Sequence, residues 1–134
     1  MALSEGSGYE VITSEEAFQQ VLQKSEVVVV DWMAKWCRKC IYLKPKLEKL
    51  VRDEFPQLSL AFVDVNAVPV QVVTGNGIKK MPTIAVYRRG EKITQHIAAE
   101  GGTGAIQKIR EMLQGCELKA GGEVQPDGEV QPVQ

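Results

Sequence analysis

The chain has 134 residues, which suits one globular domain, because two domains of that total length would each bury too little surface. Its 16 basic and 17 acidic residues give a formal net charge of -1, which argues against a general binder of nucleic acid or anionic membranes. No apolar run approaches the roughly 20 residues of a membrane helix, so we expect a soluble protein. We also expect it to act as a monomer.

The two ends of the chain differ in composition from the part between them. Residues 1–8 lack the features of a signal or transit peptide, so we expect a flexible N-terminus with no targeting segment, or with one already removed. Near the other end Gly-Glu-Val-Gln-Pro occurs twice, at 122–126 and 128–132. This composition predicts a disordered tail over 115–134, which is either a linker without function or a short recognition motif.

Apolar spacing predicts the first elements of the domain, after an initial strand or turn. Thr13 and Glu16 form a capping-box pattern at the start of a helix that ends near Lys24. Residues 27–30 are four valines, apolar on both faces as in a central strand covered on each side, and Asp31 is expected at the carboxyl end of this strand.

The remaining elements follow from apolar runs and turn residues. In order they are a helix over 37–55 that contains Pro45, a strand over 58–65, a short helical turn over 69–74, hairpin strands over 83–87 and 92–98, and a last helix that Thr103 caps and Gly115 ends. This order predicts an α/β domain over 9–114, with a central mixed β-sheet flanked by helices.

Two cysteines separated by two residues, in the sequence Cys37-Arg38-Lys39-Cys40, lie where a strand leads into a helix. In this context the pattern is typical of a redox pair. The unpaired N–H groups and the dipole of a helix N-terminus favour a thiolate. We therefore predict that Cys37 attacks a disulfide, and that Cys40, one turn further in and more shielded, resolves the mixed disulfide.

Half of a zinc site is the alternative interpretation of the cysteine pair, because Cys-x-x-Cys also occurs in zinc sites. Only Cys116 and His96 remain as soft ligands, and both are distant in sequence. We therefore expect no metal, and the predicted chemistry needs no cofactor. Cys116 is expected to be an exposed spare thiol, open to glutathionylation or intermolecular pairing.

The sequence Val-Asp-Trp-Met-Ala-Lys-Trp-Cys-Arg-Lys-Cys at 30–40 and the later Met-Pro-Thr at 81–83 resemble the thioredoxin family. The Trp-Cys-Arg-Lys-Cys form, with Ile-Tyr-Leu-Lys-Pro-Lys-Leu-Glu-Lys-Leu after it, is similar to the atypical WCRKC thioredoxin-like proteins of plant chloroplasts. The resemblance covers about residues 9 to 114. It implies a thioredoxin fold, protein thiol-disulfide oxidoreductase activity and a place in the chloroplast stroma, with the cytoplasm as the alternative.

The resemblance also implies roles for residues outside the cysteine pair. Pro82 would be a cis proline facing the cysteines, and the backbone of Met81 would pair with a substrate strand. Asp31 would be a buried acid with a raised pKa that accepts the proton of Cys40, unless it is a strand-end aspartate satisfied by local N–H groups. Trp36 would position the substrate, unless it is a plain core aromatic residue.

The sequence departs from the common family pattern at several positions. Arg38 and Lys39 replace Gly and Pro, and we expect them to contact substrates and to shift the couple toward oxidising behaviour. Phe62 stands where a lysine often neighbours the buried acid, so Asp31 is expected to lack a cationic partner. Two further replacements are Met33 for a Trp and Ala98 for a Gly.

Basic residues recur on segments that the implied fold gathers around the pair, namely Lys35, Arg38, Lys39, Lys79 and Lys80. They predict either a basic rim that steers acidic partner surfaces or an ordinary solvated face. The expected partners are client proteins with disulfides and an electron-donating reductase or glutathione. Two other functions stay open: a redox-sensitive binding module with little turnover, and a glutathione-linked, glutaredoxin-like oxidoreductase.

Overall fold

The computed structural model describes residues 9–121, with side chains to residue 116. The predicted N-terminus at 1–8, and residues 122–134 of the predicted tail, lie outside the described residues. The described part forms a five-stranded sheet in the order β1-β3-β2-β4-β5. The strands are β1 (Val11–Ile12), β2 (Val27–Met33), β3 (Ser59–Asp64), β4 (Thr83–Arg88) and β5 (Glu91–Ile97).

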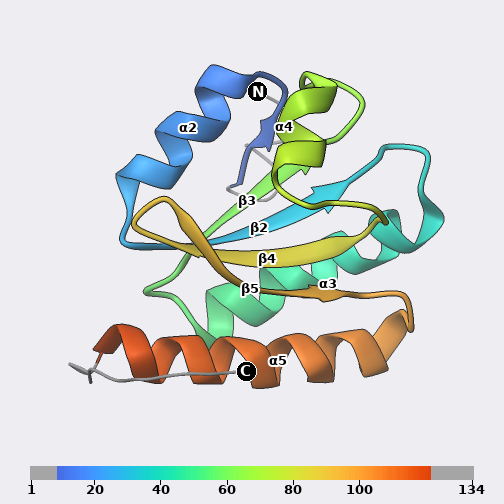
Figure 1. The fold of residues 1–134 in the computed structure, drawn as a ribbon. Coiled ribbons are helices and arrows are strands. Elements are labelled where there is room, and N and C mark those ends of the chain that lie inside the picture. The colour runs from blue at the N-terminus through green and yellow to red at the C-terminus, as the bar shows by residue number, and fades with distance from the viewer. Residues whose placement is uncertain (1–8, 122–134) are drawn as a thin grey trace.

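The sheet is mixed, because β1, β3 and β2 run parallel while β4 is antiparallel to β2 and β5 is antiparallel to β4. Helices α2 and α4 cover one face, and α3 and α5 cover the other (Figure 1). Their bounds are α2 (Glu15–Lys24), α3 (Arg38–Glu54), α4 (Val70–Gly75) and α5 (Gly102–Gly121). The predicted mixed sheet flanked by helices is confirmed. Within the described chain no helix is long and apolar enough to cross a membrane.

The central strand β2 divides the core into two layers, since alternate side chains of a strand point to opposite faces. Val28, Val30 and Trp32 pack with the side chains of α2 and α4. Val29 and Met33 pack with those of α3 and α5. Every residue of β2 is buried, as the run of valines predicted.

Two predicted boundaries near the start of the chain were wrong. Asp31 does not end the central strand, because β2 continues to Met33 and keeps Asp31 in its interior. The N-cap of α2 is Ser14 and not Thr13, since the Ser14 hydroxyl oxygen accepts a hydrogen bond from the Ala17 N–H at 3.1 Å. Both serine and threonine can cap a helix, so the sequence pattern alone did not decide between neighbours.

The predicted start and end of the last helix were also wrong. Thr103 is not its cap, because α5 begins at Gly102, and the helix passes Gly115 and ends at Gly121. Gly115 does not adopt the left-handed conformation in which glycine ends many helices. Cys116 packs into the core beside Leu113, and this packing favours continuation of the helix through the glycine.

The hairpin between β4 and β5 turns at Arg89 and Gly90, which have φ angles of 53° and 87°. Two left-handed residues in a two-residue loop match the twist of the flanking strands. The predicted hairpin is confirmed, and its turn places β5 beside α5.

We expect Gly90→Ala to lower the free energy of unfolding by about 1 kcal/mol, because an L side chain at this φ is strained although nothing lies within 4 Å of the added Cβ. Gly75→Ala is the matched control. Gly75, the last residue of α4, has no left-handed φ angle, and nothing lies within 4 Å of a Cβ added there either. Urea titration of both variants measures the difference. Equal destabilisation by the two substitutions would contradict the backbone argument.

Candidate active site

The cysteine pair lies at the N-terminus of α3, directly after β2 and a short turn. Cys37 is the N-cap residue, and its Sγ accepts a hydrogen bond from the N–H of Cys40 at 3.3 Å. The Cys37 N–H donates to the carbonyl oxygen of Ala34 at 3.1 Å, which fixes the turn. The two thiols therefore sit close together, with one of them held against the unpaired N–H groups of the first helical turn.

Both thiols are free and largely covered by neighbouring residues. Cys37 is 9% exposed and Cys40 is 3% exposed. Burial raises the pKa of the Cys40 thiol to about 12, with a further rise from the adjacent Cys37 sulfur. Cys37 is the more accessible thiol, and Cys40 holds its proton strongly.

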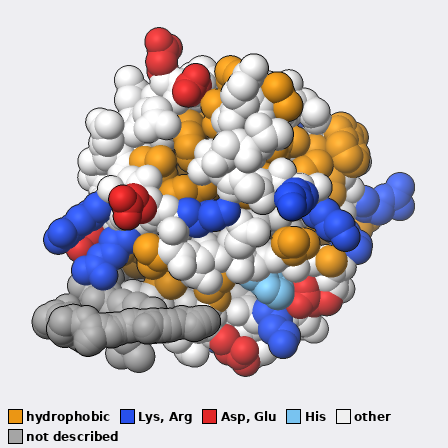
Figure 2. All heavy atoms as spheres, viewed as in Figure 1, with side chains coloured by type: hydrophobic (Ala, Val, Ile, Leu, Met, Phe, Trp, Pro, Cys, Tyr) orange, Lys and Arg blue, Asp and Glu red, His pale blue; other side chains and the backbone are white. Residues whose placement is uncertain are grey.

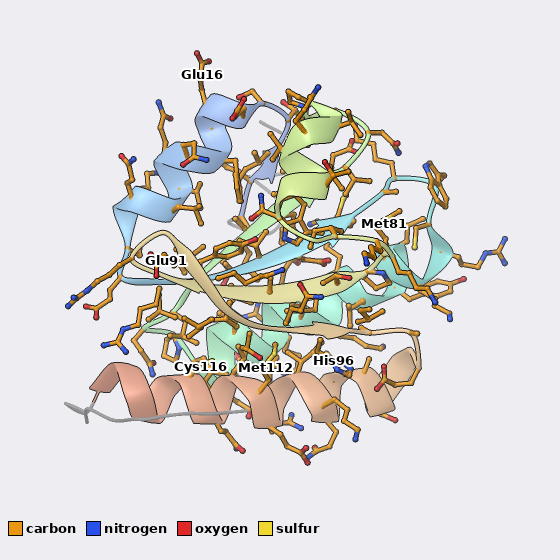
Figure 3. The ribbon with its side chains drawn as sticks, viewed as in Figure 1. Glu16, Met81, Glu91, His96, Met112 and Cys116 are labelled. Carbon is orange, nitrogen blue, oxygen red and sulfur yellow. The ribbon has the colours of Figure 1, made fainter. Side chains whose placement is uncertain are left out.

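The Met81-Pro82 peptide bond is cis, as the resemblance implied. The Cys37 Sγ lies 3.9 Å from the carbonyl oxygen of Met81, so this loop does face the cysteines. Figure 3 shows Met81 on the loop before β4, near the N-terminal end of α3. The Pro82 carbonyl accepts a hydrogen bond from the N–H of Ala98 at 2.9 Å, which ties the loop to the end of β5.

Asp31 is fully buried on the sheet face that α3 covers, in phase with Val29 and Met33. Neither carboxylate oxygen has a hydrogen-bond partner among the described residues. The alternative of an aspartate satisfied by local N–H groups was therefore wrong. Burial raises the pKa of Asp31 to about 8, while the positive charge of Lys44 opposes the rise and the negative charge of Glu48 adds to it.

The expected lack of a cation near Asp31 was also wrong. Lys44 of α3 lies over the ring of Phe62, with its Nζ 4.6 Å from the ring centroid, and acts electrostatically on Asp31. Neither Lys44 nor Glu48 was among the predicted site residues. The signal for them was a Lys and a Glu four residues apart in a helix, beside the apolar stripe that carries Cys40.

The three other predicted site residues lie on the surface next to the pair. Trp36 is 69% exposed, so the core-aromatic alternative was wrong. Arg38 is exposed at the first position of α3. Lys39 is exposed as well, but its Nζ donates to the carbonyl oxygen of Ala99 at 2.7 Å, so Lys39 fastens α3 to the segment after β5.

All five residues of the predicted basic rim are exposed: Lys35, Arg38, Lys39, Lys79 and Lys80. In the view of Figure 2, Lys and Arg side chains gather beside exposed hydrophobic atoms at the end of the molecule where Figure 3 labels Met81. The same view shows a second group of Lys and Arg side chains at the opposite end, so the basic rim stays a prediction.

Cys116 is 6% exposed and packs in the core, so the predicted exposed thiol was wrong. Figure 3 shows it on α5, on the side that faces the sheet. The other predicted soft ligand, His96, pairs with Glu100 at 3.1 Å on the surface. Among the described side chains no group of three or more His, Cys, Asp or Glu is placed to hold a metal ion.

A cysteine pair at a helix N-terminus, a cis-proline loop against the first thiol and a buried carboxyl on the central strand define a dithiol site on a thioredoxin-type mixed sheet. The thioredoxin family model matches residues 9–111. The chain belongs to the thioredoxin family.

Curated relatives include two chloroplastic proteins of Arabidopsis thaliana. The chain is 46% identical to thioredoxin-like 3-2 over 107 residues, which cover 77% of this chain and 56% of that protein. It is 43% identical to thioredoxin-like 3-1 over 91 residues, which cover 68% of this chain and 43% of that protein. The chain thus spans about half the length of these relatives.

Solved structures agree with the fold. A thioredoxin from Malassezia sympodialis is 30% identical, with a TM-score of 0.65 over 78% of this chain and 91% of that one. A thioredoxin from Plasmodium falciparum is 26% identical, with a TM-score of 0.67 over 77% and 97%.

The buried carboxyl predicts how stability depends on pH. The folded protein keeps a proton on Asp31 up to about pH 8, whereas an unfolded chain releases it near the ordinary pKa of 3.8. The folded state therefore binds more protons between these values, so the free energy of unfolding falls as pH rises. Each unit of pKa difference corresponds to about 1.4 kcal/mol.

We expect Asp31→Asn to remove this decline, so that the variant gains stability over the native protein as pH rises from about 4 to 8. Urea midpoints across this range measure the effect. Asp53→Asn is the control, because Asp53 is an exposed aspartate whose pKa is lowered by its hydrogen bond to Lys49. Parallel pH profiles of the native protein and Asp31→Asn would show that burial of Asp31 does not raise its pKa.

Proposed function

We propose that the protein is a thiol-disulfide oxidoreductase of client proteins, in which Cys37 is the attacking thiolate, Cys40 the resolving thiol and Asp31 the proton acceptor. The observation that carries the proposal is the juxtaposition of the two free thiols, with the Cys40 N–H donating to the Cys37 sulfur at 3.3 Å. Membership of the thioredoxin family supports the same chemistry. The reaction needs no metal or cofactor.

The first step is attack of the Cys37 thiolate on a client disulfide. A bond forms between Cys37 and one client sulfur, and the other client sulfur leaves as a thiolate. The N–H of Cys40 donates to the Cys37 sulfur, which holds that sulfur at the N-terminal end of α3.

The second step releases the client. Asp31 takes the proton of Cys40, and the resulting thiolate attacks Cys37, so that a disulfide forms between the two cysteines while the second client sulfur leaves. The client disulfide gains two electrons and the cysteine pair loses two. Burial of both groups, and the electrostatic coupling between them, support this transfer.

Client binding is proposed at the surface around Cys37. The exposed ring of Trp36 offers an apolar contact, and Arg38 and Lys39 add positive charge beside it. The Met81 carbonyl oxygen lies 3.9 Å from the Cys37 sulfur. A client strand that pairs with the Met81 backbone would therefore bring its own sulfur close to Cys37. Pro82 holds this loop through its hydrogen bond from Ala98.

The oxidised pair must regain two electrons from a donor. A bifunctional thioredoxin reductase/thioredoxin of Mycobacterium leprae is 24% identical over 102 residues, which supports a reductase as the donor. Glutathione is the alternative donor. Positive charge from Arg38 and Lys39 favours the reduced, thiolate form, which would make the couple more oxidising than one with Gly and Pro there. The Arabidopsis relatives named chloroplastic support a place in the chloroplast, within which we propose the stroma.

The assignment of roles predicts an asymmetry between two variants. Cys40→Ser should accumulate a covalent mixed disulfide between Cys37 and a client, because a serine hydroxyl is far too weak a nucleophile at neutral pH to release it. Cys37→Ser should accumulate none, because Cys40 is 3% exposed and keeps its proton. Non-reducing gels after incubation with a model protein disulfide measure both outcomes.

Cys116→Ser combined with each variant is the control, and the buried position of Cys116 predicts no change. Equal trapping by the two variants would overturn the nucleophile assignment. Failure of the native protein to turn over the model disulfide with any donor would instead favour a binding module, and recycling by glutathione alone would favour a glutaredoxin-like enzyme.

A further inference from the structure

We propose that Lys44 is a positioning residue of the exchange reaction: held by Glu48 against the ring of Phe62, its ammonium group is the cationic partner of the Asp31 carboxylate that takes the proton of Cys40. The inference rests on the proposed function, because only the exchange reaction uses this proton transfer. It assigns to α3 both the thiols and the charge that tunes their proton acceptor.

The sheet register gives Asp31 apolar neighbours on both sides. Asp31 lies opposite Phe62 on β3 and opposite Ile84 on β4, and all three residues are fully buried. Directly opposite residues of adjacent strands point to the same face. The carboxyl group is therefore flanked by hydrocarbon within the sheet, and charge must reach it from the helix layer above.

The helix that covers this face presents a row of polar groups at four-residue spacing. Cys40, Lys44 and Glu48 follow one another along one side of α3. The Lys44 Nζ lies 4.6 Å from the centroid of the Phe62 ring, and Phe62 is the direct neighbour of Asp31. Lys44 thus reaches the sheet beside the carboxyl, one turn beyond the thiol that gives up the proton.

Glu48 holds Lys44 in this position. The Lys44 Nζ lies 2.6 Å from Glu48 Oε2, and the two side chains are only 22% and 11% exposed. The other lysine pair of this spacing in α3, Lys49 with Asp53, has side chains 71% and 45% exposed. A largely covered pair is screened less by solvent and salt, so the Lys44 charge acts on its surroundings more strongly.

The other charged groups of this face are further along the sheet or already paired. Asp64, at the end of β3, accepts a hydrogen bond from the Asn66 N–H at 3.0 Å and lies 4.0 Å from the Lys35 Nζ. The residues of α5 that pack on this layer are apolar or, in Cys116, a thiol. His96, opposite Ile84 on β5, is paired with Glu100 at 3.1 Å. Among the described residues, Lys44 and Glu48 are accordingly the two charged side chains that shift the pKa of Asp31, with opposite signs.

Lys44 and Glu48 together set how readily Asp31 ionises, and the resolving step depends on this ionisation. Lys44 favours the ionised carboxylate, which is the form that can accept the Cys40 proton. Glu48 limits that effect, because its negative charge lies beside the ammonium group and opposes it. Loss of Lys44 should leave Asp31 protonated at higher pH, so that fewer molecules can start the second step at neutral pH.

The test is the titration of the Asp31 carboxyl carbon by NMR in the reduced protein, which requires no client and no turnover. We expect Lys44→Met to raise the Asp31 midpoint by about one pH unit and Lys44→Arg to keep it near the native value. Lys49→Met is the matched control on the same helix and should change nothing.

An Asp31 midpoint that is the same in Lys44→Met, Lys49→Met and the native protein would overturn the proposal. Should Lys44→Met fail to fold, Lys44→Gln decides, and a native midpoint in that variant overturns the proposal. Failure of the proposed function is a separate result: the native protein would then leave a protein disulfide unreduced while the Lys44-dependent shift of Asp31 still appeared.

Discussion

The burial of the Asp31 carboxyl group, on the sheet face that α3 covers, is the constraint on which the rest of this site depends. Asp31 has no exposed surface, and its two oxygens have no hydrogen-bond partner among the described residues. An ionised carboxylate in such surroundings is costly, so Asp31 keeps its proton to about pH 8. A group that both holds and releases a proton near neutral pH is suited to general acid-base chemistry.

Helix α3 brings together the elements that use this property. Its N-terminus carries Cys37, its first turn carries Cys40, and the next two turns carry Lys44 and Glu48 on the same side. Leu43 and Leu47 anchor the helix in the core, which fixes the height of the polar row above the sheet. Because thiols and charges share one rigid element, their mutual geometry does not depend on loop conformation.

Much of the fold could be predicted from the sequence, because four consecutive valines and the helical spacing around Leu47 have few structural solutions. The cysteine pair could be predicted too, since its spacing and its place at a strand-helix junction carry the chemistry. The neighbours of a residue across the sheet could not be predicted, because no local sequence pattern places Phe62 opposite Asp31 or brings Lys44 over the Phe62 ring. The exposure of Cys116 was misjudged for a similar reason, since a glycine before it indicated a helix end, and only packing of α5 on the core carries the helix further.

The central claim, that Asp31 accepts the Cys40 proton in the resolving step, is tested most directly by stopped-flow reaction of the reduced protein with an aromatic disulfide that releases a coloured thiol. Attack by Cys37 releases the first coloured thiol and attack by Cys40 the second, so the second phase reports resolution alone. The account predicts that the rate of this phase rises with pH through a midpoint near that of Asp31, and that Asp31→Asn loses the inflection and slows by roughly 10²-fold or more. The same rate and the same inflection in both proteins would contradict it.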